Sequence, residues 1–189
     1  MSQKTSKEQL LKKLYKQFSH CSDFPLETTG ATRVVFGEGN PDAKLMIIGE
    51  APGKQEDELG KPFVGRSGKL LTSILEQAGL TRYEIFITNV VKCRPPNNRK
   101  PKPHEVALYK KLILLQEIAI INPRVIVTLG ATALEALLEN GTKISKARGI
   151  VQHQNGLLIV PTYHPAYILR NPTKLNDFAQ DIKFSKSLL

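Results

Sequence analysis

Residues 45–53, with the sequence LMIIGEAPG, decide the fold of this chain: a short apolar run ends at a glycine and leads into a turn with a proline and a second glycine. An apolar run of this length between turn residues is typical of a strand that is buried on both faces. Three similar runs follow at 85–91, 125–129 and 157–160, and helical patterns separate them. Strands that alternate with helices predict an α/β fold, with a mostly parallel sheet between two layers of helices.

The segments around these strands complete the expected architecture. Apolar residues at helical spacing predict helices at 4–19, around 70–78, at 106–121, at 131–139, near residue 166 and from residue 173 onward. The segments 53–65 and 94–103 are expected to be loops, because they are rich in glycine or proline.

Length, composition and charge restrict the class of protein. The 189 residues fit a single domain over 1–189, with residues 1–33 forming an N-terminal helix and a connecting segment. The sequence contains no run of the roughly 18–20 apolar residues that a membrane helix needs and no secretory signal pattern, so we expect a cytoplasmic protein. It carries no clear signal for an oligomer, so we expect a monomer. The net charge of +10 favours an anionic partner. Nucleic acid, a membrane surface and plain solubility all remain open on charge alone.

Polar residues follow three of the expected strands. Glu50 and Gly53 come after the first strand, Asn89 ends the second, and His164 follows the fourth. Parallel sheets bind ligands beyond the carboxyl ends of their strands, so these segments should line one site. An asparagine amide could read a base edge, and a histidine could donate a hydrogen bond to a leaving group. Each residue also has a structural reading, as a solvated turn, a strand cap or a structural histidine.

Two further segments carry residues that suit nucleic acid. Phe63 lies between glycines and a proline, where its ring could stack on a base or fold back onto the core. Arg66 and Lys69, near the start of the next helix, could meet phosphate. An apolar run beside Arg170 suits a wedge that enters a base stack, although a helix could equally pack these side chains inward. The run consists of Tyr167, Ile168 and Leu169.

Taken in order, several of these segments resemble the family 4 uracil-DNA glycosylases of bacteria and archaea. The matching segments begin near Val34 and are FGEGNP, GEAPG, EDELGKPFVGRSGKLL, ITNVVKCRPPNNRKP, PRVIVTLGATALEALL, SKARG and PTYHPAYILRNP. The resemblance implies a three-layer α/β/α fold with a central four-stranded parallel sheet. It also implies an enzyme that flips uracil out of DNA and hydrolyses its N-glycosidic bond, which leaves an abasic site.

The resemblance further assigns roles to individual residues. Phe63 would stack on the flipped uracil, Asn89 would read its Watson–Crick edge, His164 would bond uracil O2, and Glu50 would position or activate water. Gly53 stands where related families have a tyrosine that excludes the methyl group of thymine. The other expected substrate-binding residues are Gly49, Ala51 and Pro52. The expected DNA contacts are Arg66, Ser67, Lys69, Arg94, Tyr167, Ile168, Leu169 and Arg170.

The chain departs from this family at its metal cluster. Family 4 members usually hold a four-iron cluster with four cysteines, but this sequence has two, Cys21 and Cys93, at the first and third positions. Phe24 and Tyr109 stand at the other two, and neither can ligate iron. We therefore expect no cluster and no metal, with Phe24 and Tyr109 filling the space and both cysteines reduced.

Two alternatives to this enzyme remain at this stage. One is a non-catalytic protein on the same fold that binds damaged or single-stranded DNA. The other is an α/β enzyme that handles nucleotides, although the chain lacks the usual phosphate-loop spacings. The chain also lacks the KRRIH-type insertion of a related branch that is trapped covalently on DNA, so we expect turnover.

Overall fold

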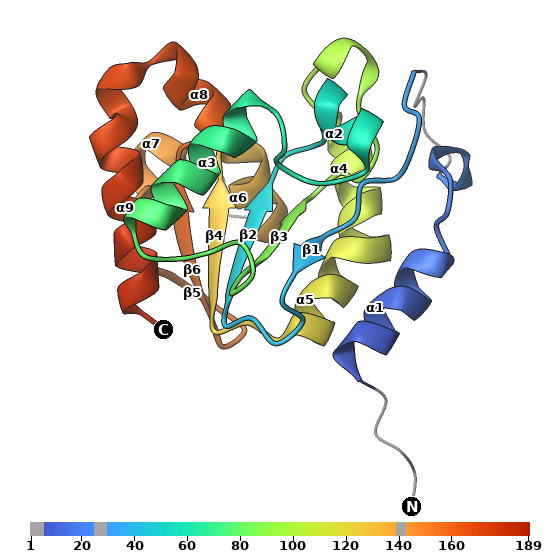
Figure 1. Ribbon diagram of the computed structural model, residues 1–189, viewed down its shortest axis with the longest axis horizontal. Coiled ribbons are helices and arrows are strands. Elements are labelled where there is room, and N and C mark those ends of the chain that lie inside the picture. The colour runs from blue at the N-terminus through green and yellow to red at the C-terminus, as the bar shows by residue number, and fades with distance from the viewer. Residues whose placement is uncertain (1–5, 25–29, 139–142) are drawn as a thin grey trace, which may run out of the picture.

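The computed structural model describes residues 6–24, 30–138 and 143–189, and it has a central sheet with helices on both faces (Figure 1). The strand order in this sheet is β1-β3-β2-β4-β6-β5. The four central strands are parallel and are the four expected from the sequence. They are β3 (Phe86–Asn89), β2 (Leu45–Gly49), β4 (Val125–Leu129) and β6 (Leu157–Thr162).

Two short antiparallel strands extend the sheet at its edges, so the sheet has six strands rather than the expected four. β1 (Glu38–Gly39) pairs with β3, and β5 (Gln152–Gln154) pairs with β6. Both are two or three residues long and are largely polar, so they lack the apolar run that identifies the central strands.

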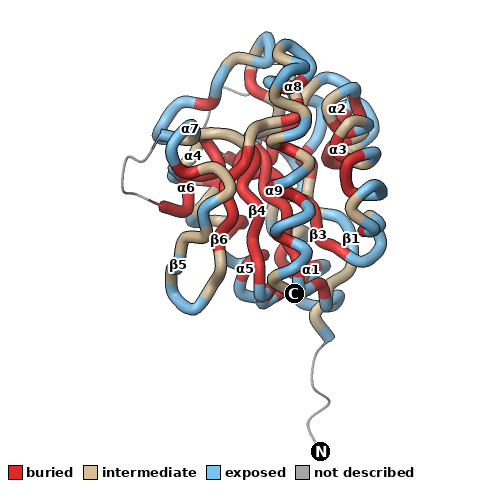
Figure 2. Tube along the Cα trace, turned by 90° about the vertical axis from the view of Figure 1, so that its left-hand side faces the viewer, coloured by how far each residue is buried: buried red, intermediate tan, exposed pale blue. Residues whose placement is uncertain are grey.

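The side chains of each central strand alternate between the two faces of the sheet. In β2, Met46 and Ile48 belong to one apolar cluster, whereas Leu45 and Ile47 belong to the other. The first cluster is covered by α1 (Lys7–Lys16), α4 (Pro103–Tyr109), α5 (Leu115–Ile121), α6 (Ala131–Leu137) and α7 (Ile144–Ala147). The second is covered by α3 (Arg66–Gln77), α8 (Pro165–Arg170) and α9 (Leu175–Ser187). Both faces of the strands are therefore buried, as Figure 2 shows.

The segment 53–65 is not the continuous loop that the sequence predicted. It contains a short helix, α2 (Lys54–Leu59), which begins at Gly53 and ends at Gly60, whose φ is +71°. Left-handed backbone of this kind stops a helix and suits glycine. The glycines thus mark the two ends of a helix rather than a loop.

Other elements differ from expectation mainly at their ends. The expected helix over 106–121 begins at Pro103, and a π-helical segment (Lys110–Leu114) joins α4 to α5. A short 3₁₀ turn (Pro96–Asn98) occupies the expected loop at 94–103. The last residue of the expected helix at 131–139 lies outside the described residues. Within the described part of the chain, no helix has the length and apolarity needed to cross a membrane.

Candidate active site

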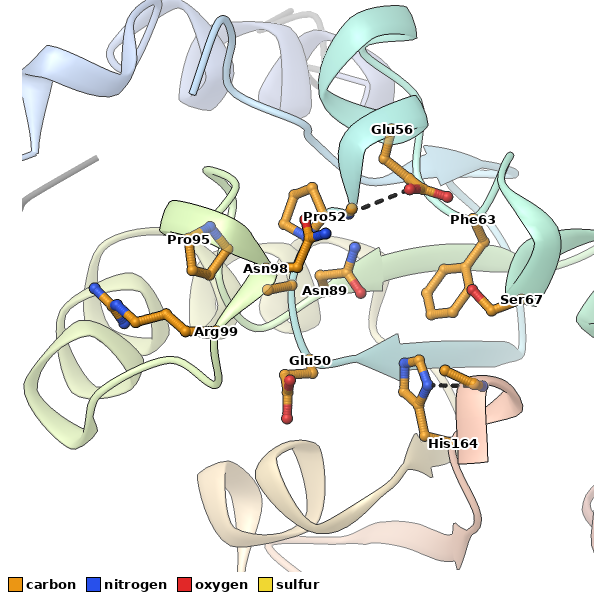
Figure 3. A pocket seen from close by; sticks show the side chains of 13 residues that line it. Glu50, Pro52, Glu56, Phe63, Ser67, Asn89, Pro95, Asn98, Arg99 and His164 are labelled. Carbon is orange, nitrogen blue, oxygen red and sulfur yellow. Dashed lines mark hydrogen bonds between the residues drawn. The ribbon is translucent and has the colours of Figure 1, made fainter. Parts of the chain in front are cut away.

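The carboxyl ends of the central strands meet at a small cavity, as the sequence predicted. Its volume is about 180 Å³, which is below the ~300–1,000 Å³ of pockets for drug-sized ligands and suits a single base. Figure 3 shows its side chains, which come from segments far apart in the sequence. The lining residues are Glu50, Ala51, Pro52, Gly53, Glu56, Phe63, Ser67, Asn89, Pro95, Asn98, Arg99, His164 and Ala166.

Gly49 lies behind the cavity and lets two functional side chains approach the backbone of β2. A Cβ atom added at Gly49 would lie 2.4 Å from Asn89 Oδ1 and 2.4 Å from Phe63 Cζ. Real Cβ atoms essentially never approach other atoms this closely. Gly49 is therefore required by shape rather than by its own contact with a ligand.

Asn89 presents an unsatisfied acceptor in this region. Asn89 is almost fully buried at the end of β3, and its Oδ1 has no hydrogen-bond partner among the residues that the structure describes. A buried polar atom left in this state costs about 1–3 kcal/mol. A ligand with an N–H group at this position would recover that free energy.

His164 is held as a neutral imidazole with a defined tautomer. The backbone N–H of Ala166 donates to His164 Nδ1 at 3.1 Å, so the ring carries its proton on Nε2. Burial, together with the positive charge of Arg170, lowers the pKa of His164 to about 4, although Glu56 opposes this shift. The ring centroid lies 5.9 Å from that of Phe63. His164 can therefore offer an Nε2–H donor next to the aromatic ring.

Glu50 is held by a residue that the sequence analysis did not select. Thr132, at the start of α6, donates from its hydroxyl to Glu50 Oε2. Thr132 follows β4, so its place after a strand end was a usable signal. The hydrogen bond fixes the carboxylate of Glu50 at the edge of the cavity.

Phe63 forms part of the cavity wall in an uncommon backbone conformation. Its φ is +53°, in the left-handed region that residues other than glycine seldom adopt. The carboxylate of Glu56 supports this turn, because it accepts from the N–H groups of Val64 at 3.0 Å and Gly65 at 2.8 Å. Glu56 also accepts from Gly53 N at 3.2 Å. The sequence does not single out Glu56, because its glycines predict a loop where α2 forms.

The expected DNA contacts fall into three groups. Ser67 lines the cavity, and Arg94 lies beside it with its Nε bonded to Asn98 Oδ1 at 2.7 Å. The residues with exposed side chains are Arg66, Lys69, Tyr167, Leu169 and Arg170. Ile168 is different: it is only 2% exposed and packs in the core cluster of α3 and α9. The prediction of Ile168 as a DNA wedge is therefore wrong, because α8 turns this side chain inward and leaves Leu169 outside.

The region where family members usually hold a four-iron cluster is built differently in this chain. Cys21 and Cys93 form a disulfide with Cα atoms 5.9 Å apart, which corrects the expectation of two reduced thiols. The rings of Phe24 and Tyr109 are buried and pack with centroids 4.4 Å apart. In the described residues, no group of three or more histidine, cysteine or acidic side chains is placed to hold a metal. These residues do not fit a four-iron cluster with four thiolate ligands.

Comparisons with known proteins identify the family of this chain. The family model described as "Uracil DNA glycosylase superfamily" matches residues 36–185. A type-4 uracil-DNA glycosylase of Thermotoga maritima is 44% identical, and the match covers 97% of each chain. Type-4 uracil-DNA glycosylases of Sulfurisphaera tokodaii and Pyrobaculum aerophilum are 43% and 42% identical, over 83% and 91% of this chain and 75% and 91% of theirs. With its strand-end cavity and these matches along nearly its whole length, the chain belongs to the uracil DNA glycosylase superfamily and, within it, to the type-4 family.

Proposed function

We propose that this protein is a uracil-DNA glycosylase, which turns uracil out of DNA and hydrolyses the bond between the base and its sugar. The unsatisfied Oδ1 of Asn89 carries this proposal. It lies beside Phe63 at the end of a cavity that suits a single base. The N3–H of uracil is the donor that this oxygen lacks, and the amide NH₂ of the same residue can donate to uracil O4.

The other walls of the cavity suit a flat pyrimidine. The ring of Phe63 offers a stacking surface, which is worth about 1–3 kcal/mol for one base. His164, which follows β6, lines the same cavity, and its Nε2–H can donate to uracil O2. Base flipping costs a few kcal/mol, and these contacts are of similar size, so they offset much of the unstacking free energy.

The hydrolysis follows from how charge develops when the glycosidic bond breaks. The electron pair of the C1′–N1 bond leaves with uracil, so the base becomes anionic and the sugar takes on oxocarbenium character. The Nε2–H of His164 stabilises the charge on uracil O2. Water adds to C1′, its hydroxyl stays on the sugar, and its proton balances the charge on the base.

Glu50 serves the sugar side of this reaction. Its carboxylate is held by Thr132, so it faces the cavity edge in one orientation. A fixed negative charge there stabilises the positive sugar and can orient the attacking water. The division between His164 for the base and Glu50 for the sugar matches the two charges that the bond cleavage creates.

The surface around the cavity suits the DNA strand. Arg66, Lys69 and Arg170 are exposed near it, and the whole chain has a net charge of +10. Exposed Tyr167 and Leu169 on α8 are the apolar side chains available to fill the gap left by the flipped base.

We further infer that the protein performs this reaction without a four-iron cluster. The support is the disulfide between Cys21 and Cys93 and the packed rings of Phe24 and Tyr109 at the other two cysteine positions of the family. Iron and sulfide analysis after anaerobic purification, with an absorbance scan around 400 nm, tests this inference. Stoichiometric iron and sulfide would overturn it.

Cleavage of a uracil-containing oligonucleotide after alkali treatment tests the function, because alkali breaks the strand only at abasic sites. We expect cleavage by the wild-type chain and an approximately 100- to 1000-fold lower single-turnover rate for His164→Ala. DNA affinity and the unfolding temperature should change little. His153→Ala, at an exposed position on β5, is the matched control and should keep the wild-type rate. Binding of uracil-DNA without any release of base would instead support a non-catalytic DNA-binding protein.

A further inference from the structure

The turn that carries Phe63 is held from two sides. A residue other than glycine with φ of +53° needs support from its surroundings, since this conformation is strained. On one side of the turn, Glu56 accepts from the N–H groups of Val64 and Gly65. The peptide carbonyls of the turn are bonded by a different residue, Arg82.

Arg82 reaches this turn from the connection between α3 and β3. Its Nη2 donates to Pro62 O at 2.8 Å, and its Nη1 donates to Phe63 O at 3.0 Å. Nη1 also approaches Thr72 Oγ1 at 3.4 Å. Two successive carbonyls are therefore bonded by one planar guanidinium, whose two arms are fixed relative to each other. A lysine ammonium is a point charge and cannot reproduce this fork.

The packing behind the turn leaves it little freedom to move. Gly68, in the first turn of α3, lies so close that an added Cβ would come within 2.0 Å of Phe63 O. Arg82 is partly buried and lines a separate hollow with Glu38 and Tyr83, outside the cavity that receives the base. Of the residues to which Arg82 donates, Phe63 is the one that lines the cavity, so the direct route from Arg82 to a bound base runs through Phe63.

We propose that Arg82 is a positioning residue that holds the ring of Phe63 in the orientation that stacks on the flipped base. This inference rests on the proposed uracil-DNA glycosylase activity. It assigns to Arg82 an effect on base capture that goes beyond the general stability of the fold.

A double-mutant cycle tests this role. Single-turnover uracil excision is measured for the wild type, Arg82→Gln, Phe63→Ala and the double variant, at a temperature where thermal unfolding shows all four to be folded. We expect Phe63→Ala to lose on the order of 5- to 150-fold, the range for stacking of one base. Arg82→Gln should lose up to the same factor. The double variant should be no slower than Phe63→Ala, because Arg82 has no ring left to position.

Two further variants separate positioning from other effects. Arg82→Lys should be slower than the wild type, because it keeps the charge but loses the two-armed donor geometry of the guanidinium. If Arg82→Gln unfolds, Arg82→Lys takes its place in the cycle. Arg124→Gln is the matched control, since Arg124 also donates to a backbone carbonyl, Leu189 O at 2.7 Å, at the opposite end of the sheet. It should excise uracil at the wild-type rate.

Binding experiments identify the step that changes. A duplex with 2′-fluoro-deoxyuridine, which resists cleavage, is compared with the same duplex without uracil. Arg82→Gln should weaken binding to the first duplex and leave binding to the second unchanged at every salt concentration. A shallower dependence of binding on salt would show a phosphate contact and overturn the proposal.

The outcomes of the cycle are also distinct. If the wild type is active and Arg82→Gln has the same rate, or if the two losses multiply in the double variant, the proposed role of Arg82 is overturned and the proposed function is not. A wild-type chain that releases no uracil overturns the proposed function and this inference together.

Discussion

Substitution of Gly49 by alanine tests whether the shape of the cavity, rather than the identity of the residues that line it, determines activity. The added methyl group would point at Asn89 Oδ1 and Phe63 Cζ, each 2.4 Å away. Ordinary contacts of a Cβ atom begin at about 3.4 Å, so each of the two side chains must retreat by about 1 Å. Neither neighbour is the free end of a flexible chain, because Phe63 is held in its turn and Asn89 is buried in the strand end.

This displacement has two consequences of different size. Overpacking of a buried site typically costs about 1–3 kcal/mol of folding free energy. A shift of 1 Å in groups that orient a substrate can lower a rate by about 100-fold. We therefore expect Gly49→Ala to remain folded and to excise uracil about 100-fold more slowly than the wild type.

Gly37→Ala provides a matched control for the loss of stability. Its added methyl group would lie 2.3 Å from Phe86 Cε1 and 3.1 Å from Glu117 Oε1, in the core on the other side of β3. Single-turnover excision and chemical unfolding are measured for both variants. We expect both variants to be destabilised and only Gly49→Ala to be much slower. A Gly49→Ala rate within threefold of the wild type, or equal losses in the two variants, would refute it.

Three other predictions follow from the contacts around the site. Reduction of the disulfide between Cys21 and Cys93, which lie 72 residues apart, should lower the free energy of unfolding by up to about 4 kcal/mol. The Cys93→Ser variant should have the same stability as the reduced protein. An unfolding midpoint that does not change with reductant would show that the disulfide does not form. His164 should stay neutral and protonated on Nε2 down to about pH 5 in NMR spectra, because burial lowers its pKa to about 4. Since this value lies below the roughly 6.5 of an unfolded histidine, its contribution to stability is complete above pH 6.5 and is lost as the pH falls toward 4; titration near pH 6.5 in the folded protein would contradict the assignment. Thr132→Val should lower the excision rate by about 10-fold through loss of the hydrogen bond to Glu50, whereas Thr128→Val should not, because Thr128 Oγ1 is buried with no partner among the described residues; equal effects would argue against a role for the Glu50 contact.

The sequence was sufficient to predict the central sheet and the meeting of its strand ends. Each central strand is a buried apolar run, and burial on both faces produces this signal without reference to the rest of the chain. The position of Glu50, Asn89 and His164 at one cavity then follows from the parallel strand direction. The edge strands could not be found in this way, because two or three polar residues carry no period.

The sequence alone does not determine the contacts between distant segments. The inward turn of Ile168 depends on how α8 packs against α3 and α9, since the apolar run 167–169 has two possible inner sides. The disulfide depends on the approach of two segments 72 residues apart. The helix α2 differs for another reason: five of its six residues, KQEDEL, are good helix formers, but the glycines on either side predict a loop.

The neutral His164 and the positive charge of the whole chain stabilise the reaction in different ways, one locally and the other at long range. The charge of +10 acts over the surface, where it attracts DNA and favours the departing uracil anion at long range. Inside the cavity, a cationic imidazole is disfavoured by burial and by Arg170. A neutral Nε2–H donor that is already oriented needs no proton from solvent and no reorganisation when charge develops on uracil O2. The excision rate should therefore be insensitive to pH between about 6 and 8 as far as His164 is concerned, and should depend far more on the orientation of its ring.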